Sequence, residues 1–217
     1  MQGFKGKVIL ITGAGRGAGR VIAEAFGRQG AVVAANDITP INLDETVTRI
    51  RNAGGQVKDY IFDIAKRLPA QALVEQVFED WGRLDVLVNH ANVRPHTNLL
   101  EMDEWDWQRT LDVNLSGVFY LLQNTARVMR SQGGGVVLNI GRFAYQTQPQ
   151  KGHAAYLASI NGLAGLTRAA ADELAAYNIR VNMIWAGSLE AKIDPELVLN
   201  LCGPSAVHLS GQVISVE

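Results

Sequence analysis

The chain has 217 residues, 47% of them hydrophobic, which predicts a folded domain with a substantial core and excludes extended disorder. Its 20 Lys and Arg residues are scattered and are balanced by 21 Asp and Glu residues, so we expect no nucleic-acid-binding surface. One cysteine, no apolar run of membrane-spanning length and an apolar run that starts already at Val8 predict a cytoplasmic protein without disulfides, signal peptide or membrane contact.

Short β-branched runs alternate with longer segments in which apolar residues recur every three or four positions. The runs predict strands at residues 8–11, 31–35, 60–62, 86–88, 136–140 and 179–184, and the periodic segments predict helices at residues 21–28, 43–53, 70–81, 105–132 and 155–177. Several strand runs are almost continuously apolar, which is typical of a parallel sheet covered on both faces. We therefore predict an α/β fold, a doubly wound, Rossmann-like parallel sheet with helices on both faces. No linker divides the chain, so residues 1–217 are expected to form a single domain.

The first expected strand runs directly into a glycine-rich string, Thr12-Gly13-Ala14-Gly15-Arg16-Gly17-Ala18-Gly19, and then into a helix. Glycines at alternate positions allow a tight turn and the close approach of a pyrophosphate, while the helix offers free N–H groups and the positive end of its dipole. A preceding strand and a following helix are the context that a dinucleotide-binding turn requires. The cofactor-binding residues predicted here are Gly13, Gly15, Arg16, Gly17, Ala18 and Gly19.

Asp37 ends the second expected strand, at roughly the 20-residue spacing typical of a ribose-binding acid. Its carboxylate can accept hydrogen bonds from both ribose hydroxyls of an adenosine and would repel a 2′-phosphate, which favours NAD. Arg16 argues the other way, because a guanidinium beside that ribose could hold the phosphate. No second basic residue follows Asp37 directly, so we predict NAD as the cofactor and consider NADP less favoured.

Asp63 follows the third expected strand, and its role has two interpretations. It is placed to accept a hydrogen bond from the amino group of an adenine base. Alternatively, it is an ordinary N-cap of the helix that begins after Lys66. The sequence leaves both open.

Together these motifs resemble the short-chain dehydrogenase/reductase family, and the likeness extends over nearly the whole chain. The glycine string follows the family pattern Thr-Gly-x-x-x-Gly-x-Gly, Asp63 matches the aspartate after the third strand, and Asn114 matches the asparagine of the long central helix. The catalytic tyrosine matches at Tyr156, Arg180-Val181-Asn182 also fits, and residues 210–216 look like the family's last strand. In character the chain is most similar to 3-oxoacyl reductases and secondary-alcohol dehydrogenases.

The resemblance implies an oxidoreductase in which a tyrosine exchanges a proton with the substrate oxygen while hydride moves to or from a nicotinamide. It assigns Tyr156 and Asn114 to catalysis and implies no metal site. It implies a homodimer or homotetramer, or a hetero-oligomer with an active relative, built through helices that correspond to residues 115–132 and 155–177. The further cofactor-binding residues that it implies are Ile64, Asn89, Ala91 and Gly187.

The departures from the family pattern are concentrated at the chemistry. The family's Asn-Asn-Ala-Gly appears as Asn89-His90-Ala91-Asn92. Arg142 stands where a serine should hold the substrate carbonyl, and Ile160 stands where a lysine should follow Tyr156 by four residues. The segment at about residues 188–209 is shorter than the family's helical lid, so we expect an abbreviated lid over the substrate.

The loss of the lysine has a calculable cost. An unperturbed tyrosine has a pKa of about 10, so only about one part in a thousand is phenolate at neutral pH. With Ile160 in place of the cation that corrects this, about 4 kcal/mol, or about a thousandfold in rate, is lost. Losing the serine costs a further factor of about 10². We predict that standard alcohol–ketone turnover is impaired.

Arg142 is the one candidate for compensation, because it ends a central strand at the crevice where doubly wound folds bind ligands. Its guanidinium could lower the pKa of Tyr156, clamp a carboxylate or phosphate of the ligand, or point to solvent. His90 and His153 lie close to site positions, and we interpret both as incidental. The indoles interpreted as packing residues are Trp81, Trp105 and Trp107.

Three functional hypotheses follow. In the first, the chain binds NAD(H) but has lost its chemistry and serves as a silent subunit or cofactor sensor. In the second, it is an active NAD(P)-dependent oxidoreductase in which Tyr156 and Arg142 act on an anionic alcohol or carbonyl compound. In the third, it is a non-redox enzyme that uses Tyr156 as an acid or base. The expected ligands are a dinucleotide and a small molecule whose identity the sequence does not give.

Overall fold

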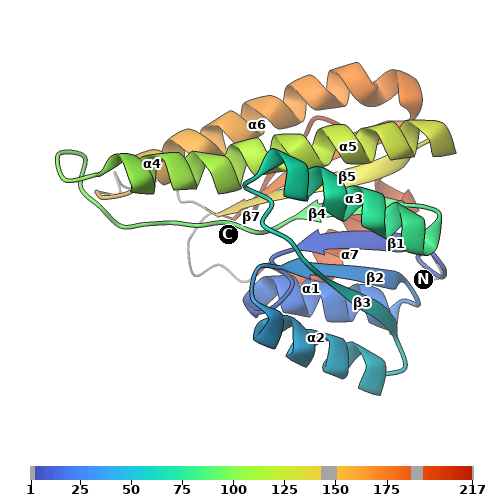
Figure 1. Cartoon of the computed structure of the whole chain (residues 1–217). Helices are drawn as coiled ribbons and strands as arrows, with labels where there is room; N and C mark the ends of the chain where they lie inside the picture. The colour runs from blue at the N-terminus through green and yellow to red at the C-terminus, as the bar shows by residue number, and fades with distance from the viewer. Residues whose placement is uncertain (1–2, 143–150, 187–192, 217) are drawn as a thin grey trace.

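Seven parallel strands form the centre of the molecule, in the order β3-β2-β1-β4-β5-β6-β7 (Figure 1). The computed structural model describes residues 3–142, 151–186 and 193–216. The strands are β1 Val8–Thr12, β2 Val32–Asp37, β3 Gln56–Ile61, β4 Val86–Asn89, β5 Gly135–Arg142, β6 Ile179–Ala186 and β7 Val213–Val216. The α-helices are α1 Gly17–Arg28, α2 Pro40–Asn52, α3 Arg67–Trp81, α4 Glu104–Leu111, α5 Gly117–Gln132, α6 Ala154–Leu174 and α7 Pro195–Cys202.

The sheet is buried on both faces, because successive side chains of each strand point to opposite sides. In β1, Ile9 and Ile11 join the core that α1, α2 and α7 cover, whereas Val8 and Leu10 join the core that α3, α5 and α6 cover. Figure 1 shows these two helical layers on either side of the strands. The doubly wound sheet predicted from the continuous apolar runs is confirmed.

The strand order reverses between β1 and β4, which are neighbours in the sheet. The chain leaves β1 toward β2 and β3 on one side and later continues from β4 toward β5 on the other. At such a switch point the connecting loops diverge and leave a crevice at the carboxyl ends of the strands. The glycine string follows β1. Residues 89–92 begin at the last residue of β4 and continue into the loop after it, so two sequence motifs meet at this crevice.

The helix predicted at residues 105–132 is interrupted by a π-helical turn, Asp112–Ser116, between α4 and α5. Just after that turn, a Cβ on Gly117 would lie 2.7 Å from the carbonyl oxygen of Ile64. The glycine therefore lets the helix pack directly on the loop after β3. The apolar periodicity did not reveal the turn, because a π-helical turn inserts a single residue and leaves the spacing on either side unchanged.

The third strand begins at Gln56, four residues earlier than the predicted strand at 60–62. It lies at the edge of the sheet, and only Val57 and Tyr60 are buried in it, so no continuous apolar run marks its start. The Tyr60 hydroxyl donates to Asp80 at 2.7 Å and accepts from the indole N–H of Trp81 at 2.8 Å. Trp81 is thus a packing residue, as predicted.

From Ile193 onwards, the segment expected to be an abbreviated lid packs on the body of the domain. Helix α7, which was not predicted, lies against α1 and buries Val198, Leu199 and Cys202. A start signal was present, since the Asp194 carboxylate accepts from the backbone N–H of Glu196 and Pro195 occupies the first turn. Residues 188–192 of the expected lid lie outside the described part of the chain.

A partly buried guanidinium holds the stretch after α7 in place. Arg180 on β6 donates hydrogen bonds of 2.9 to 3.3 Å to four backbone carbonyl oxygens. Their residues are Leu201, Gly203, Ala206 and Leu209. One side chain thereby satisfies the carbonyl groups that the irregular chain cannot pair by itself.

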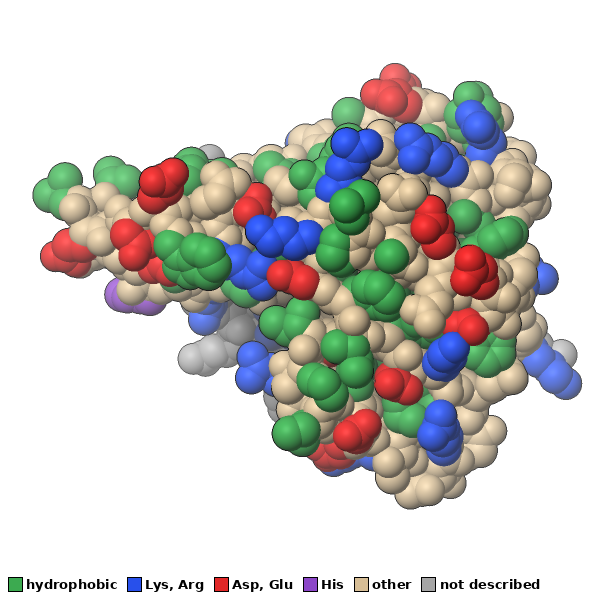
Figure 2. Space-filling model, in the orientation of Figure 1, with side chains coloured by type: hydrophobic (Ala, Val, Ile, Leu, Met, Phe, Trp, Pro, Cys, Tyr) green, Lys and Arg blue, Asp and Glu red, His purple; other side chains and the backbone are tan. Residues whose placement is uncertain are grey.

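Helix α4 and the turn before it project from the body of the molecule (Figure 1). Leu100 is 99% exposed and Trp105 71% exposed, and Figure 2 shows hydrophobic side chains on this projecting end. Trp107 is 39% exposed, and Thr110 alone in α4 is buried. The interpretation of Trp105 and Trp107 as packing residues is therefore wrong, because α4 extends beyond the sheet and has little core to pack against.

The described part of the chain has no helix that is both long and apolar enough to cross a membrane. It also has no cluster of three His, Cys, Asp or Glu side chains that could hold a metal ion. Cys202 is buried, and this burial raises the pKa of its thiol to about 12. The thiol therefore stays protonated and acts as a small apolar group, as interpreted from the sequence.

Candidate functional site

A cavity of about 770 Å³ lies at the carboxyl ends of β1, β2, β4 and β5. Its volume falls within the roughly 300–1,000 Å³ typical of small-molecule and cofactor sites. The predicted site residues that line it are Gly13, Arg16, Gly17, Ala18, Asp37, Asp63, Ile64, Ala91, Arg142 and Tyr156. Four predicted residues do not line it, namely Gly15, Gly19, Asn89 and Asn114, and Gly187 lies outside the described residues.

The glycine turn brings backbone segments closer together than any side chain would allow. Gly13 has a φ of +66°, and a Cβ there would lie 2.9 Å from the Cα of Ala91. A Cβ on Gly19 would clash with the carbonyl oxygen of Gly13. Gly19 therefore serves the packing of α1 on the turn, while Gly13 and Gly17 face the cavity. The result is a backbone-walled cradle at a helix N-terminus, which fits a pyrophosphate.

Asp37 ties the glycine turn to the end of β2. Its carboxylate accepts hydrogen bonds of 3.1 Å from the backbone N–H groups of Gly15 and Thr39. These two bonds fix the carboxylate at the edge of the cavity, which Asp37 lines. Arg16, the competing phosphate-binding candidate, is exposed and ends the turn as the N-cap residue of α1.

Arg20 supports the turn from behind, and the sequence motif did not predict this role. Its Nε donates to the carbonyl oxygen of Gly15 at 3.1 Å and to the Thr46 hydroxyl at 3.0 Å. The same guanidinium pairs with Glu45 at 2.7 Å. The Thr46 hydroxyl in turn donates to the carbonyl oxygen of Ala14 at 2.9 Å. The carbonyl groups of Ala14 and Gly15 are thus engaged within the protein.

Asp63 lies on the cavity wall but is not a helix cap, because α3 begins after Lys66, whose position is the N-cap. Its carboxylate forms an ion pair with Arg109 of α4, with an N···O distance of 3.1 Å, and also accepts from the backbone N–H of Ala65. The capping interpretation is therefore wrong. Arg109 lines the same cavity and was not predicted, because nothing in the sequence relates α4 to the loop after β3.

Asn89 belongs to a buried chain of hydrogen bonds. Its amide donates to the Asn139 side chain at 2.9 Å, and Asn139 donates to the Thr167 hydroxyl at 2.9 Å. The chain joins β4, β5 and α6. The Thr12 hydroxyl accepts from the backbone N–H groups that follow Asn89, at His90 and Ala91, both at 3.1 Å. These contacts hold the loop after β4 against the glycine turn.

His90 packs its imidazole on the glycine turn, where a Cβ on Gly19 would lie 2.8 Å from Nδ1. That nitrogen is buried and has no hydrogen-bond partner within the described residues. Burial, and next the charge of Arg142, lower the pKa of His90 to about 4. The imidazole is therefore neutral at pH 7 and is unsuited to act as a general acid there.

Tyr156 is 1% exposed, and its hydroxyl oxygen accepts a hydrogen bond of 3.2 Å from the backbone N–H of Arg142. Burial raises the pKa of Tyr156, while this hydrogen bond and the charges of Arg94 and Arg142 oppose the rise. The net direction is upward. Of the alternatives for Arg142, its charge does act to lower the pKa of Tyr156, but desolvation outweighs this effect.

Ile160 lies one helical turn after Tyr156 and is 1% exposed. It packs with Tyr156, Leu163 and Met183 in a small apolar cluster, and a Cβ on Gly141 would lie 3.0 Å from its Cγ2. The side chain does not line the cavity. The space from which a cation would stabilise the phenolate is thus part of the hydrophobic core.

Asn114 sits in the π-helical turn and clamps the loop after β4. Its side chain accepts from the backbone N–H of Val93 and donates to the carbonyl oxygen of the same residue, both at 2.9 Å. It also donates to the Ser159 hydroxyl at 3.1 Å. Since the side chain is fully engaged and 1% exposed, its contacts are those of a positioning residue.

Arg94 joins the tyrosine end of the cavity, and the sequence analysis missed it. It lines the wall with Arg142 and contributes to the electrostatic environment of both Tyr156 and His153. The pKa of His153 is lowered by burial, then by the charges of Arg94 and His96. A signal was present, since Arg94 lies two positions after the altered residues 89–92.

The comparisons with known proteins agree with this geometry. Residues 7–200 match the sequence profile of the family described as short chain dehydrogenase. A 3-oxoacyl-acyl-carrier-protein reductase, FabG, of Thermotoga maritima is 37% identical over 194 residues, which are 89% of this chain and 78% of that protein.

Two solved structures have nearly the same fold. A 7α-hydroxysteroid dehydrogenase complexed with NADH and 7-oxo glycochenodeoxycholic acid has a TM-score of 0.91 and 29% identity, over 99% of this chain and 94% of the other. A metagenomic short-chain oxidoreductase in complex with NADP has a TM-score of 0.90 and 32% identity, over 99% of each chain. With the family profile covering most of its length, this chain belongs to the short-chain dehydrogenase family of oxidoreductases, whose members bind nicotinamide dinucleotides.

Proposed function

We propose that this protein binds NAD(H) in the crevice between β1 and β4 and that its standard alcohol–ketone chemistry is impaired. It then serves as a silent subunit or a cofactor sensor. The observation that carries the proposal is the packing of Ile160. Together with other core side chains, Ile160 occupies the space where a phenolate-stabilising cation would stand. The cradle of the glycine turn supports cofactor binding, since Gly13 and Gly17 line the cavity without a Cβ and the turn leads into the N-terminus of α1.

The choice of NAD over NADP rests on Asp37. Its carboxylate lies on the cavity wall, at the end of β2, where it would accept from ribose hydroxyls and repel a 2′-phosphate. Arg16 is the one residue of the glycine turn that argues for NADP; it lines the cavity and is exposed. The related structures include an NADH complex and an NADP complex, so the local charges decide.

The impairment follows from the protonation of Tyr156. A bound nicotinamide supplies or accepts hydride, and the chain must then move a proton at the substrate oxygen. With its pKa raised by burial, the Tyr156 hydroxyl stays protonated at neutral pH and does not act as a base. Its oxygen already accepts a hydrogen bond from the backbone N–H of Arg142, but this bond stabilises a phenolate less than a cation in contact with it would.

A double revertant tests the proposal. We expect Arg142→Ser with Ile160→Lys to raise NAD-dependent turnover of secondary alcohols by about 10³ or more, while the wild type binds NADH without turnover. Adding Tyr156→Phe to the revertant should remove the gain. NADH affinity, followed by fluorescence, shows that each variant is folded. Wild-type turnover at a rate usual for the family would refute the impairment.

The same assay separates the two other hypotheses. If the wild type oxidises an anionic alcohol and Arg142→Ala alone abolishes this, the protein is an active oxidoreductase that uses Tyr156 with Arg142. If the wild type forms a product without net oxidation or reduction, the protein is a non-redox enzyme that uses Tyr156 as an acid or base. Either result would replace the first hypothesis.

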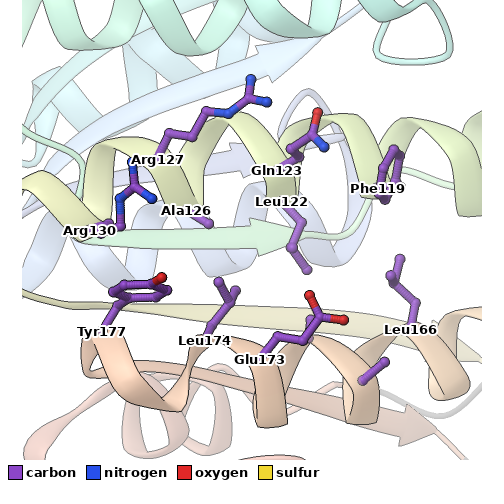
Figure 3. A pocket seen from close by; sticks show the side chains of 12 residues that line it. Phe119, Leu122, Gln123, Ala126, Arg127, Arg130, Leu166, Glu173, Leu174 and Tyr177 are labelled. Carbon is purple, nitrogen blue, oxygen red and sulfur yellow. The ribbon is translucent and has the colours of Figure 1, made fainter.

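We also infer that the protein forms a homodimer, or pairs with an active relative, through the outer faces of α5 and α6. A groove of about 310 Å³ separates these helices, and Figure 3 shows Phe119 and Leu122 of α5 facing the side of α6 that carries Leu166 and Leu174. Phe119 is 41% exposed. Light scattering tests the inference, since Phe119→Asp should yield monomers while NADH binding persists.

A further inference from the structure

We propose that Arg94 and Arg142 form an oxyanion subsite at the tyrosine end of the cavity. It takes the carboxylate or phosphate group of a small ligand that lies beside the dinucleotide. The proposal deepens the proposed function, since it gives the class of the second ligand and rests on the same cavity. It does not require turnover.

The charges along the cavity wall are unevenly compensated. At the adenosine end, Asp63 is paired with Arg109, and Asp37 accepts from two backbone N–H groups. At the tyrosine end, Arg94 and Arg142 line the wall, and no acidic side chain lines it there among the described residues. Two cations without a counter-ion favour an anion in the space before them.

Arg142 shows the clearest sign of a missing partner. Its Nε is buried and has no hydrogen-bond partner within the described part of the chain, and no ion pair of this guanidinium occurs there. A buried donor without an acceptor is unfavourable, and such groups in native proteins are usually completed by water or a ligand. A guanidinium has a fork of donors that matches a carboxylate or phosphate.

Arg94 supplies the second cation from a different part of the chain. It follows β4, whereas Arg142 ends β5, and both charges act on Tyr156. Arg94 also acts on His153, which is buried at the start of α6 and stays neutral. Within the described residues no acid is bonded to Arg94, so its charge is available to a ligand.

The position of the pair relative to Tyr156 defines the ligand. Because the backbone N–H of Arg142 contacts the Tyr156 hydroxyl, an oxyanion on the guanidinium would place the rest of the ligand next to that hydroxyl. A small acid suits this arrangement if its hydroxyl or carbonyl oxygen lies a few bonds from its carboxylate or phosphate group. An uncharged alcohol would leave both guanidinium groups unpaired and is disfavoured.

The test uses the full chain saturated with NADH. Malonate and inorganic phosphate are titrated in separate arms by calorimetry, at constant ionic strength set with chloride, and the uncharged malonamide is the ligand control. We expect at least one anion to bind, with malonate alone indicating a carboxylate ligand and phosphate alone a phosphate ligand. Malonamide should not bind.

Two variants and a control locate the subsite. Arg94→Met and Arg142→Met should each weaken anion binding roughly ten- to a hundredfold, as expected for a charge-assisted hydrogen bond. Arg51→Met, at the exposed end of α2 and outside the cavity wall, should leave it unchanged. NADH affinity is measured for every variant as the check on folding.

Two results would overturn the proposal. One is the absence of binding of either anion at millimolar concentration to protein that retains NADH. The other is anion affinity that both arginine variants leave intact. In both cases the proposed NADH binding stands, because it is measured separately. If NADH itself fails to bind, the titrations are repeated on the free protein. Both arginine variants should then lose anion affinity as before, and unchanged anion affinity in both would refute the subsite.

Discussion

The adenosine end and the tyrosine end of the cavity lie on the same edge of the same sheet but are built from different kinds of contact. At the adenosine end, Asp37 is anchored by the backbone N–H groups of Gly15 and Thr39, and Asp63 by Arg109. At the tyrosine end, Arg142 has a buried Nε without a partner in the described chain. Charges are balanced at one end and unbalanced at the other.

The difference shows which part of such a site tolerates substitution. Cofactor binding depends on the backbone of a glycine turn and a single carboxylate, and both also serve the packing of the domain. The chemistry depends on single side-chain groups that the fold does not need. Ile160 illustrates this, since an apolar side chain at that position is well packed with Tyr156 and Met183. The fold therefore accommodates an apolar side chain at this position.

The largest expected effect comes from breaking the adenosine end at Gly13. Gly13→Ala places a Cβ at positive φ and 2.9 Å from the backbone of Ala91, and we expect NADH affinity to fall by about a hundredfold or more. Gly82→Ala is the matched control, because Gly82 has nearly the same φ, +68°, and nothing within 4 Å of its Cβ position. It should cost about 1–2 kcal/mol of stability and leave NADH affinity unchanged. Equal NADH affinities in the two variants would contradict the role of close approach.

The second effect changes the cofactor preference at the same end. Asp37→Asn removes the charge that would repel a 2′-phosphate, and we expect the ratio of NADPH to NADH affinity to rise by about ten- to a hundredfold. Asp59→Asn, on the exposed side of β3, is the control and should not change the ratio. Fluorescence titration with both dinucleotides measures it. If the wild type already prefers NADPH, Arg16 rather than Asp37 determines the preference, by binding the 2′-phosphate.

A smaller effect concerns the ion pair on the cavity wall. Arg109→Met removes the ion-pair partner of the Asp63 carboxylate. We expect NADH affinity to fall by about three- to tenfold, because the carboxylate that would accept a hydrogen bond from the adenine amino group is then less well oriented. The affinity for reduced nicotinamide mononucleotide, which lacks adenosine, should not change. A loss of the same size for both ligands would show that Arg109 does not act on the adenine.

The smallest effect is a pH dependence of stability at the junction of the two ends. In the unfolded chain His90 takes up a proton below about pH 6.5, while in the folded protein it stays neutral down to about pH 4. The unfolded state thus binds more protons in this window, and stability falls as the pH falls from 6.5 toward 4. Between pH 7 and 5 we expect a contribution of at most about 2 kcal/mol.

Denaturant unfolding of His90→Asn measures this contribution. The variant should lose less stability than the wild type over the same pH interval, and His208→Asn, at an exposed position, should behave like the wild type. Identical pH slopes for wild type and His90→Asn would show that the imidazole is not held neutral by its surroundings.

Much of the architecture was predictable from local patterns. Continuous apolar runs predicted the central strands, since a parallel sheet buries both faces, and the glycine string predicted the turn at the end of β1. Where burial was one-sided or the segment short, the prediction failed. Edge strand β3 was placed too late, and α7 was missed although Asp194-Pro195 marks its start.

The sequence by itself determined the family and the layered sheet, because each of these resides in residue type and spacing along the chain. Only the tertiary structure decided which charges meet. Arg109 reaches Asp63 from 46 positions away, and Arg94 and Arg142 converge on Tyr156 from different loops. Burial of Tyr156, and hence the direction of its pKa, also arises only from packing, since desolvation is a property of the assembled core.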